Sequence, residues 1–117
     1  MTPGSRRLDD ATVRARCASP EAAAYTLYVR HLVTGPDWPG GQAAILRTAA
    51  GRGILPVGYT RQTLSEHLSG RYRHGPPWAT TELIIQCLPE YAPKSEIRAQ
   101  ARALHRAAQR RGPRPIG

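Results

Sequence analysis

The residue types best suited to binding chemistry lie between Thr60 and Trp78, in the stretch TRQTLSEHLSGRYRHGPPW. Its first half carries a guanidinium, an amide and a carboxylate on Arg61, Gln62 and Glu66, together with small hydroxyls. Its second half adds a basic aromatic loop. Such groups can hydrogen-bond along a grooved polyanion, so the stretch predicts a helix that reads DNA.

A short helix is needed to present these groups on one side. Thr60 is a favourable N-cap and Gly70 a favourable terminator, which predicts a helix over residues 61–69. Leu64 and Leu68 lie four residues apart, so they share a face that can pack on a core. The polar side chains then fall on the outward face.

The composition favours one small helical domain. The chain has 117 residues, of which 40% are hydrophobic, but it contains no Phe and only 6% aromatic residues. Its net charge is +9, and 16 of its 17 basic residues are arginine. A GC-rich genome would explain the excess of arginine over lysine. It would not explain the net charge, which is compatible with a nucleic-acid partner.

Several other chemistries lack the residues that they need. Cys17 and Cys87 form no C-x-x-C pair, so we expect two reduced thiols rather than a zinc or redox site. His67 and His74 lack a third metal ligand. No nucleophile adjoins a base, no glycine-rich phosphate loop is present, and no apolar run could cross a membrane. We expect no enzyme activity, metal or cofactor, and a cytoplasmic, nucleoid-associated protein.

The helical spacing of apolar residues predicts five short helices and no strand. The first starts at Ser19-Pro20-Glu21, which combines an N-cap, a first-turn proline and an early acid. The others are expected over about residues 42–50, 61–69, 80–88 and 94–111. The expected fold is therefore all-α, a compact bundle of about five short helices.

The last expected helix has two distinct faces. An apolar seam offers a dimer surface and consists of Ile97, Ala101, Leu104 and Ala108. On an adjacent face, arginine recurs every four residues, at Arg98, Arg102, Arg106 and Arg110. Like charges at this spacing repel by roughly a few tenths of a kcal/mol per pair. Either solvent or an acidic protein partner would cover this face.

The pattern T-x-x-T-L-S-x-x-L-S-G over residues 60–70, followed by P-P-W and an apolar helix, resembles the Cro/repressor-like (XRE) helix-turn-helix family of actinobacterial type. The resemblance covers roughly residues 42–88, and the pairing of L-S-G with P-P-W is its distinctive part. It implies a lambda-repressor-like fold and a bacterial transcriptional regulator that binds double-stranded DNA, acting as a homodimer.

In that family, the helix that matches residues 61–69 lies in the major groove. The resemblance implies that Arg61 reads guanine, Gln62 reads adenine and Glu66 accepts a hydrogen bond from cytosine. The residues that it implies as contacts to the DNA backbone are Thr60, Thr63, Ser65, Ser69, Arg71, Tyr72 and Arg73.

Three features depart from the family pattern. The turn from Gly51 to Thr60 is long and contains Pro56, so either the preceding helix is displaced or the turn forms a separate contact loop. His67 stands where an apolar residue is usual, and either caps the core or turns outward. Glu66 stands where arginine is common, so it either reads cytosine or marks a weakened site.

These features divide the chain into four parts. We expect a flexible basic arm over residues 1–18, which can end in a short helix around 11–17. A helix-turn-helix DNA-binding domain follows over residues 19–92, then the basic helix over 93–111 and a disordered tail over 112–117.

Two other classes of function remain open. The arginine face of the last helix would let the protein act as an adaptor or antitoxin-like partner of an acidic protein. Alternatively, charge alone would hold RNA or nucleoid DNA without sequence preference.

Overall fold

The computed structural model describes residues 10–35 and 40–109 of the chain. Six helices lie within these ranges: α1 (Asp10–Arg16), α2 (Pro20–Thr34), α3 (Gly41–Arg52), α4 (Arg61–His67), α5 (Trp78–Gln86) and α6 (Lys94–Gln109). The same residues contain no strand. The radius of gyration is 14.6 Å, close to the ~13 Å of a folded chain of about this length. The prediction of a compact all-α fold is confirmed.

Local signals in the sequence explain where the helices begin. At the start of α2, Ser19 Oγ accepts a hydrogen bond from Ala22 N at 3.0 Å, and Pro20 occupies the first turn. At the start of α4, Thr60 Oγ1 accepts from Thr63 N, and Thr63 Oγ1 accepts from Thr60 N, both at 3.3 Å. This reciprocal capping box fixes the first turn of α4.

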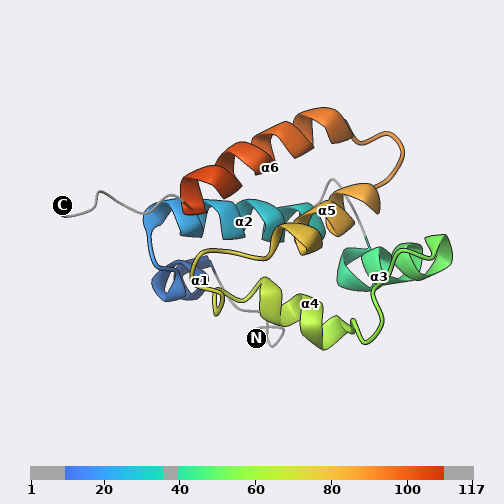
Figure 1. Ribbon diagram of the computed structural model, residues 1–117, viewed down its shortest axis with the longest axis horizontal. Coiled ribbons are helices and arrows are strands. Elements are labelled where there is room, and N and C mark those ends of the chain that lie inside the picture. Colours follow the sequence, from blue (N-terminus) through green and yellow to red (C-terminus); the bar gives the residue numbers. More distant parts are fainter. Residues whose placement is uncertain (1–9, 36–39, 110–117) are drawn as a thin grey trace, which may run out of the picture.

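α2 lies at the centre of the bundle, in contact with α1, α3, α5 and α6. α6 runs along α2 and also packs on α5, whereas α4 packs on α3. Figure 1 shows α4 and α6 on opposite sides of the molecule, with α2 and α5 between them. The predicted reading helix and the arginine-rich helix therefore present separate surfaces.

Tyr25 in α2 anchors the loop that joins α4 to α5. Its ring is fully buried, and its hydroxyl lies 2.6 Å from Thr81 Oγ1 and donates to Pro76 O at 3.2 Å. Burial raises the pKa of Tyr25 to about 12. Gly75 has a φ of 100° and approaches the Tyr25 ring so closely that a Cβ would collide with it. Only glycine fits this turn.

Part of the expected flexible arm is folded. Residues 10–16 form α1, a sixth helix, which packs on α2 and fully buries Val13. Burial of this side chain, which the sequence pattern did not show, holds the helix in place. Residues 1–9 lie outside the described part of the chain, as do Trp38, Arg110 and the expected tail over 112–117.

Two helices have bounds that differ from the predicted ones. α4 ends at His67 rather than at residue 69, because the chain tightens there and Ser69 N donates to Glu66 O at 3.2 Å. α5 spans Trp78–Gln86 rather than 80–88. Proline is favoured at the start of a helix and excluded from its interior, so α5 begins directly after Pro77 and ends before Pro89.

The apolar seam of α6 is buried within the chain. Ile97, Ala101 and Ala108 are only 8%, 0% and 3% exposed, and Leu104 packs on the same core. These residues hold α6 against α2 and α5, so the expectation that the seam forms a dimer surface is wrong. None of the described helices has the length and apolar character needed to cross a bilayer.

Candidate nucleic-acid interface

α4 separates apolar and polar side chains across its width. Leu64 is fully buried, and Leu68, which directly follows the helix, is 2% exposed. The opposite face carries only exposed residues at the predicted positions, namely Arg61, Gln62, Ser65 and Glu66. The three residues predicted to read bases thus lie together on one outward surface of one helix.

Two hydrogen bonds order this surface. Gln62 Nε2 donates to Glu66 Oε2 at 3.4 Å, one helical turn later. Ser65 Oγ donates to Gln42 Oε1 at 3.0 Å and so connects α4 with the first turn of α3. Gln42 is a site residue that sequence reasoning missed. Its proximity to Ser65 depends on how two separate helices pack, and no local pattern indicates it.

Two arginines hold the C-terminal end of α4. Arg16 Nη1 donates to Ser69 O at 3.0 Å, and Arg30 Nη1 donates to Leu68 O at 3.1 Å. The carbonyl groups at the end of a helix carry partial negative charge, so guanidinium groups stabilise them. Together with the Thr60 cap, these contacts fix both ends of the helix.

His67 points into the protein, toward α5. Its Nδ1 lies 2.6 Å from Thr80 Oγ1 and 3.4 Å from the Tyr59 hydroxyl, and Tyr59 is itself 2.8 Å from Thr80 Oγ1. The ring also makes edge contacts with Tyr59 and Tyr72, at centroid distances of 5.8 and 4.8 Å. Burial lowers the pKa of His67. Of the two orientations considered from the sequence, the inward one is observed.

The predicted backbone-contact residues fall into two groups. The hydroxyls of Thr60 and Thr63 form the capping box of α4. Ser69 is 7% exposed, and its Oγ donates to Glu66 O and accepts from Arg71 N, which makes it an internal residue. The remaining members have exposed side chains: Ser65, Arg71, Tyr72 and Arg73.

The loop after α4 lies against α1. Ala18 N donates to Arg73 O at 2.9 Å. Gly70, with a φ of 90°, comes so close to α1 that a Cβ there would press on Val13 O. α1 itself carries the exposed Arg14. Sequence reasoning placed α1 in the arm and did not foresee this arrangement.

The arginine row of α6 contacts α5 rather than only solvent. Arg98 Nε and Nη2 donate to the Glu82 carboxylate at 2.9 and 2.7 Å, which lowers the pKa of Glu82 and raises that of Arg98. The Arg102 guanidinium lies 3.9 Å from the centre of the Trp78 ring, a cation–π distance. Arg106 is exposed. Two members of the row thus hold α6 to α5.

Within residues 10–35 and 40–109, no three His, Cys, Asp or Glu side chains are grouped as metal ligands would be. Cys17 and Cys87 are free thiols, and burial raises the pKa of Cys87. No protein-family model, curated protein or solved structure matches the chain.

Proposed function

We propose that this protein is a sequence-specific double-stranded DNA-binding regulator in which α3 and α4 form a helix-turn-helix of the XRE type. The observation that carries the proposal is the outward face of α4. It presents a guanidinium and an amide in its first turn and a carboxylate in the next, on a helix whose two ends are held by hydrogen bonds. Preorganised groups lose little entropy on binding.

The proposed base contacts follow from the chemistry of the three side chains. An α-helix fits the major groove, where guanine offers O6 and N7 to Arg61 and adenine offers N7 and N6 to Gln62. Glu66 would accept from cytosine N4, and its 3.4 Å hydrogen bond from Gln62 holds the carboxylate on the reading face. The hydrogen bond to cytosine would offset the repulsion between the Glu66 carboxylate and the DNA phosphates.

The proposed backbone contacts flank the reading helix. Arg71 and Arg73 follow it on an exposed loop, which the hydrogen bond from Ala18 N to Arg73 O joins to the chain just after α1. These arginines would bind phosphates and fix the orientation of α4 without reading sequence. Tyr72 stands between them, 42% exposed, with its ring against His67.

The long turn before α4 is compatible with this arrangement. α3 packs on α4, and the Ser65–Gln42 hydrogen bond joins them directly, so the extra residues form a loop without separating the helices. That loop exposes Ile54 and, completely, Val57. We therefore favour an elaborated turn over a displaced helix.

The adaptor alternative receives less support. An acidic protein partner would need the arginine row of α6 free, whereas Arg98 pairs with Glu82 and Arg102 stacks on Trp78. A non-specific nucleic-acid binder remains the main competitor, because the net charge of +9 would serve it equally well.

Selection of bound duplexes from a random pool tests the proposal. We expect an enriched motif, and two-fold symmetry in that motif would show that a homodimer binds. Binding that depends steeply on salt but enriches no motif would contradict sequence reading and favour the non-specific alternative.

A further inference from the structure

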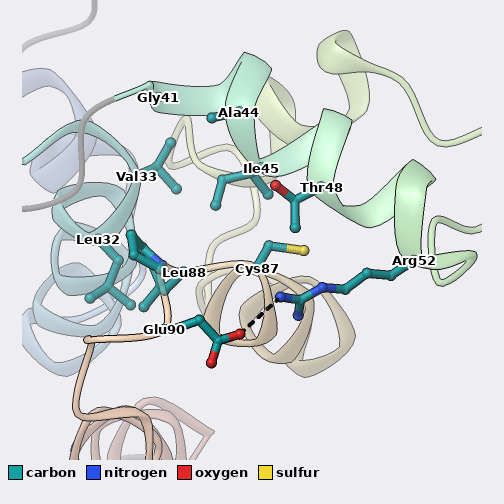
Figure 2. A pocket seen from close by; sticks show the side chains of 11 residues that line it. Leu32, Val33, Gly41, Ala44, Ile45, Thr48, Arg52, Cys87, Leu88 and Glu90 are labelled. Atoms are coloured by element: carbon teal, nitrogen blue, oxygen red, sulfur yellow. Dashed lines mark ion pairs between the residues drawn. The ribbon is translucent and has the colours of Figure 1, made fainter.

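A pocket of about 230 Å³ opens between α2, α3 and the joint that connects α5 to α6. Figure 2 shows its walls, which are mostly apolar. They consist of Leu32, Val33, Ala44, Ile45, Cys87 and Leu88. A buried apolar wall of this kind favours an apolar occupant, because such an occupant removes hydrocarbon surface from water.

Arg52, at the C-terminal end of α3, supplies the positive charge at the mouth. Its Nη1 donates to Gln86 O at 2.6 Å, and its Nη2 lies 3.8 Å from the Glu90 carboxylate. Figure 2 shows this ion pair beside the pocket. The side chains of Arg52 and Glu90 are 43% and 90% exposed, so the pair is weak and readily exchanged.

We propose that the pocket binds a small carboxylic acid whose apolar body lies among side chains of α2, α3 and the joint after α5, and whose carboxylate replaces that of Glu90 on Arg52. The volume exceeds the roughly 150 Å³ of a cavity that holds benzene. It falls below the roughly 300–1,000 Å³ of drug-sized sites. An acid on the order of ten non-hydrogen atoms matches it. Thr48 also lines the pocket.

The regulatory consequence rests on the proposed function. α3 lines the pocket through Ala44 and Ile45, and the same helix holds α4 through the Gln42–Ser65 hydrogen bond. An acid that binds between α2 and α3 stabilises this arrangement of α3 and α4 by mass action. By linkage, it raises the affinity for DNA, and DNA raises the affinity for the acid by the same factor.

Calorimetry on the full chain without DNA tests the site, with phenylbutyrate as the probe. We expect a dissociation constant on the order of 0.1–1 mM, as ligands of this size reach in modest pockets. Glu90→Gln removes the internal competitor and should tighten binding about threefold. Glu96→Gln, which makes the same charge change at an exposed position of α6, should leave it unchanged.

Two further arms test the role of charge. Arg52→Gln should weaken binding about tenfold, as expected on loss of a charge-assisted hydrogen bond. The neutral analogue phenylbutanamide should bind more weakly than the acid and should not respond to Glu90→Gln. Because Glu90 is almost fully exposed, the Glu90→Gln arm stands even if Arg52→Gln impairs folding.

The proposal is overturned if neither the wild type nor Glu90→Gln binds phenylbutyrate, or if acid and amide bind equally. Binding of the acid without sequence selection would leave the pocket standing and refute the DNA-reading proposal. Selection of a DNA motif without binding of the acid would refute the pocket proposal and leave the DNA-reading proposal standing.

Discussion

Nδ1 of His67, the last residue of α4, lies 2.6 Å from Oγ1 of Thr80 in α5. The Tyr59 hydroxyl is within 2.8 Å of the same Thr80 oxygen, so one hydroxyl serves two partners. This contact connects the end of the proposed reading helix, the turn before it and the core. The position of α4 therefore depends on a polar cluster as well as on Leu64.

Thr80→Val should destabilise the protein by about 1–3 kcal/mol, because it removes the hydroxyl that partly buried groups on His67 and Tyr59 share. Urea unfolding measures the loss. Thr34→Val is the matched control, since the Thr34 hydroxyl is exposed and donates to Arg30 O within its own helix. Equal losses for the two variants would show that the Thr80 cluster adds nothing to stability.

Stability should fall when the pH drops below the ordinary histidine pKa of 6.5. Burial lowers the pKa of His67 in the folded state, so the unfolded chain binds the extra proton first and unfolding becomes easier. The loss of stability accumulates as the pH falls from 6.5 to the lowered pKa of His67, and it stops below that pKa. His105, whose pKa is also lowered by burial, contributes in the same direction. Unfolding of His67→Asn, measured across this range, should show a flatter profile; an unchanged profile would contradict the assignment.

Glu82 and Arg98 should be energetically coupled. Their side chains are 26% and 40% exposed, so a double-mutant cycle with Glu82→Gln and Arg98→Met should give about 0.5–1 kcal/mol near neutral pH. The folded-state pKa of Glu82 lies below its ordinary 4.5. The pair therefore stabilises the fold above 4.5, and that contribution disappears as the pH falls through the lowered pKa.

Arg106→Met is the control for this cycle, because Arg106 is exposed on the same helix. It should change stability little and should show no coupling to Glu82→Gln. Coupling of equal size for Arg106 would mean that the helix carries a diffuse charge effect rather than a specific α5–α6 contact.

The sequence predicts the helices well where the signal is local. Ser19 with Pro20 starts α2, and Thr60 starts α4, because a cap needs only residues within one turn. The outward face of α4 also follows from the spacing of Leu64 and Leu68 alone. The all-helical fold and the residues on the outward face of α4 can thus be predicted from the sequence.

What the sequence does not predict depends on distant partners. The guanidinium of Arg16 reaches Ser69, 53 residues away, and Arg30 reaches Leu68, 38 residues away. The four-residue spacing of arginines in α6 defines a face but does not show that α5 covers it. The inward position of His67 likewise depends on Thr80.

Arg71 and Arg73 should contribute to DNA affinity without contributing to sequence preference. Replacing either with alanine should weaken binding to selected and random duplexes alike. It should also reduce the slope of the logarithm of the binding constant against the logarithm of the salt concentration by about 1. Fluorescence anisotropy across a salt series measures this slope. Arg106→Ala, on the opposite side of the molecule, should leave it unchanged. A larger effect on the selected duplex than on random DNA would make these residues base readers instead.

The most direct measurement is a duplex selection run in parallel on the wild type, an Arg61→Ala/Gln62→Ala variant and Arg106→Ala. The wild type and Arg106→Ala should enrich the same motif. The α4 variant should lose preference at the positions read by these two side chains, by about 1–3 kcal/mol per base contact, while it keeps its salt-dependent binding to random DNA. The same motif enriched equally by all three proteins would contradict the account.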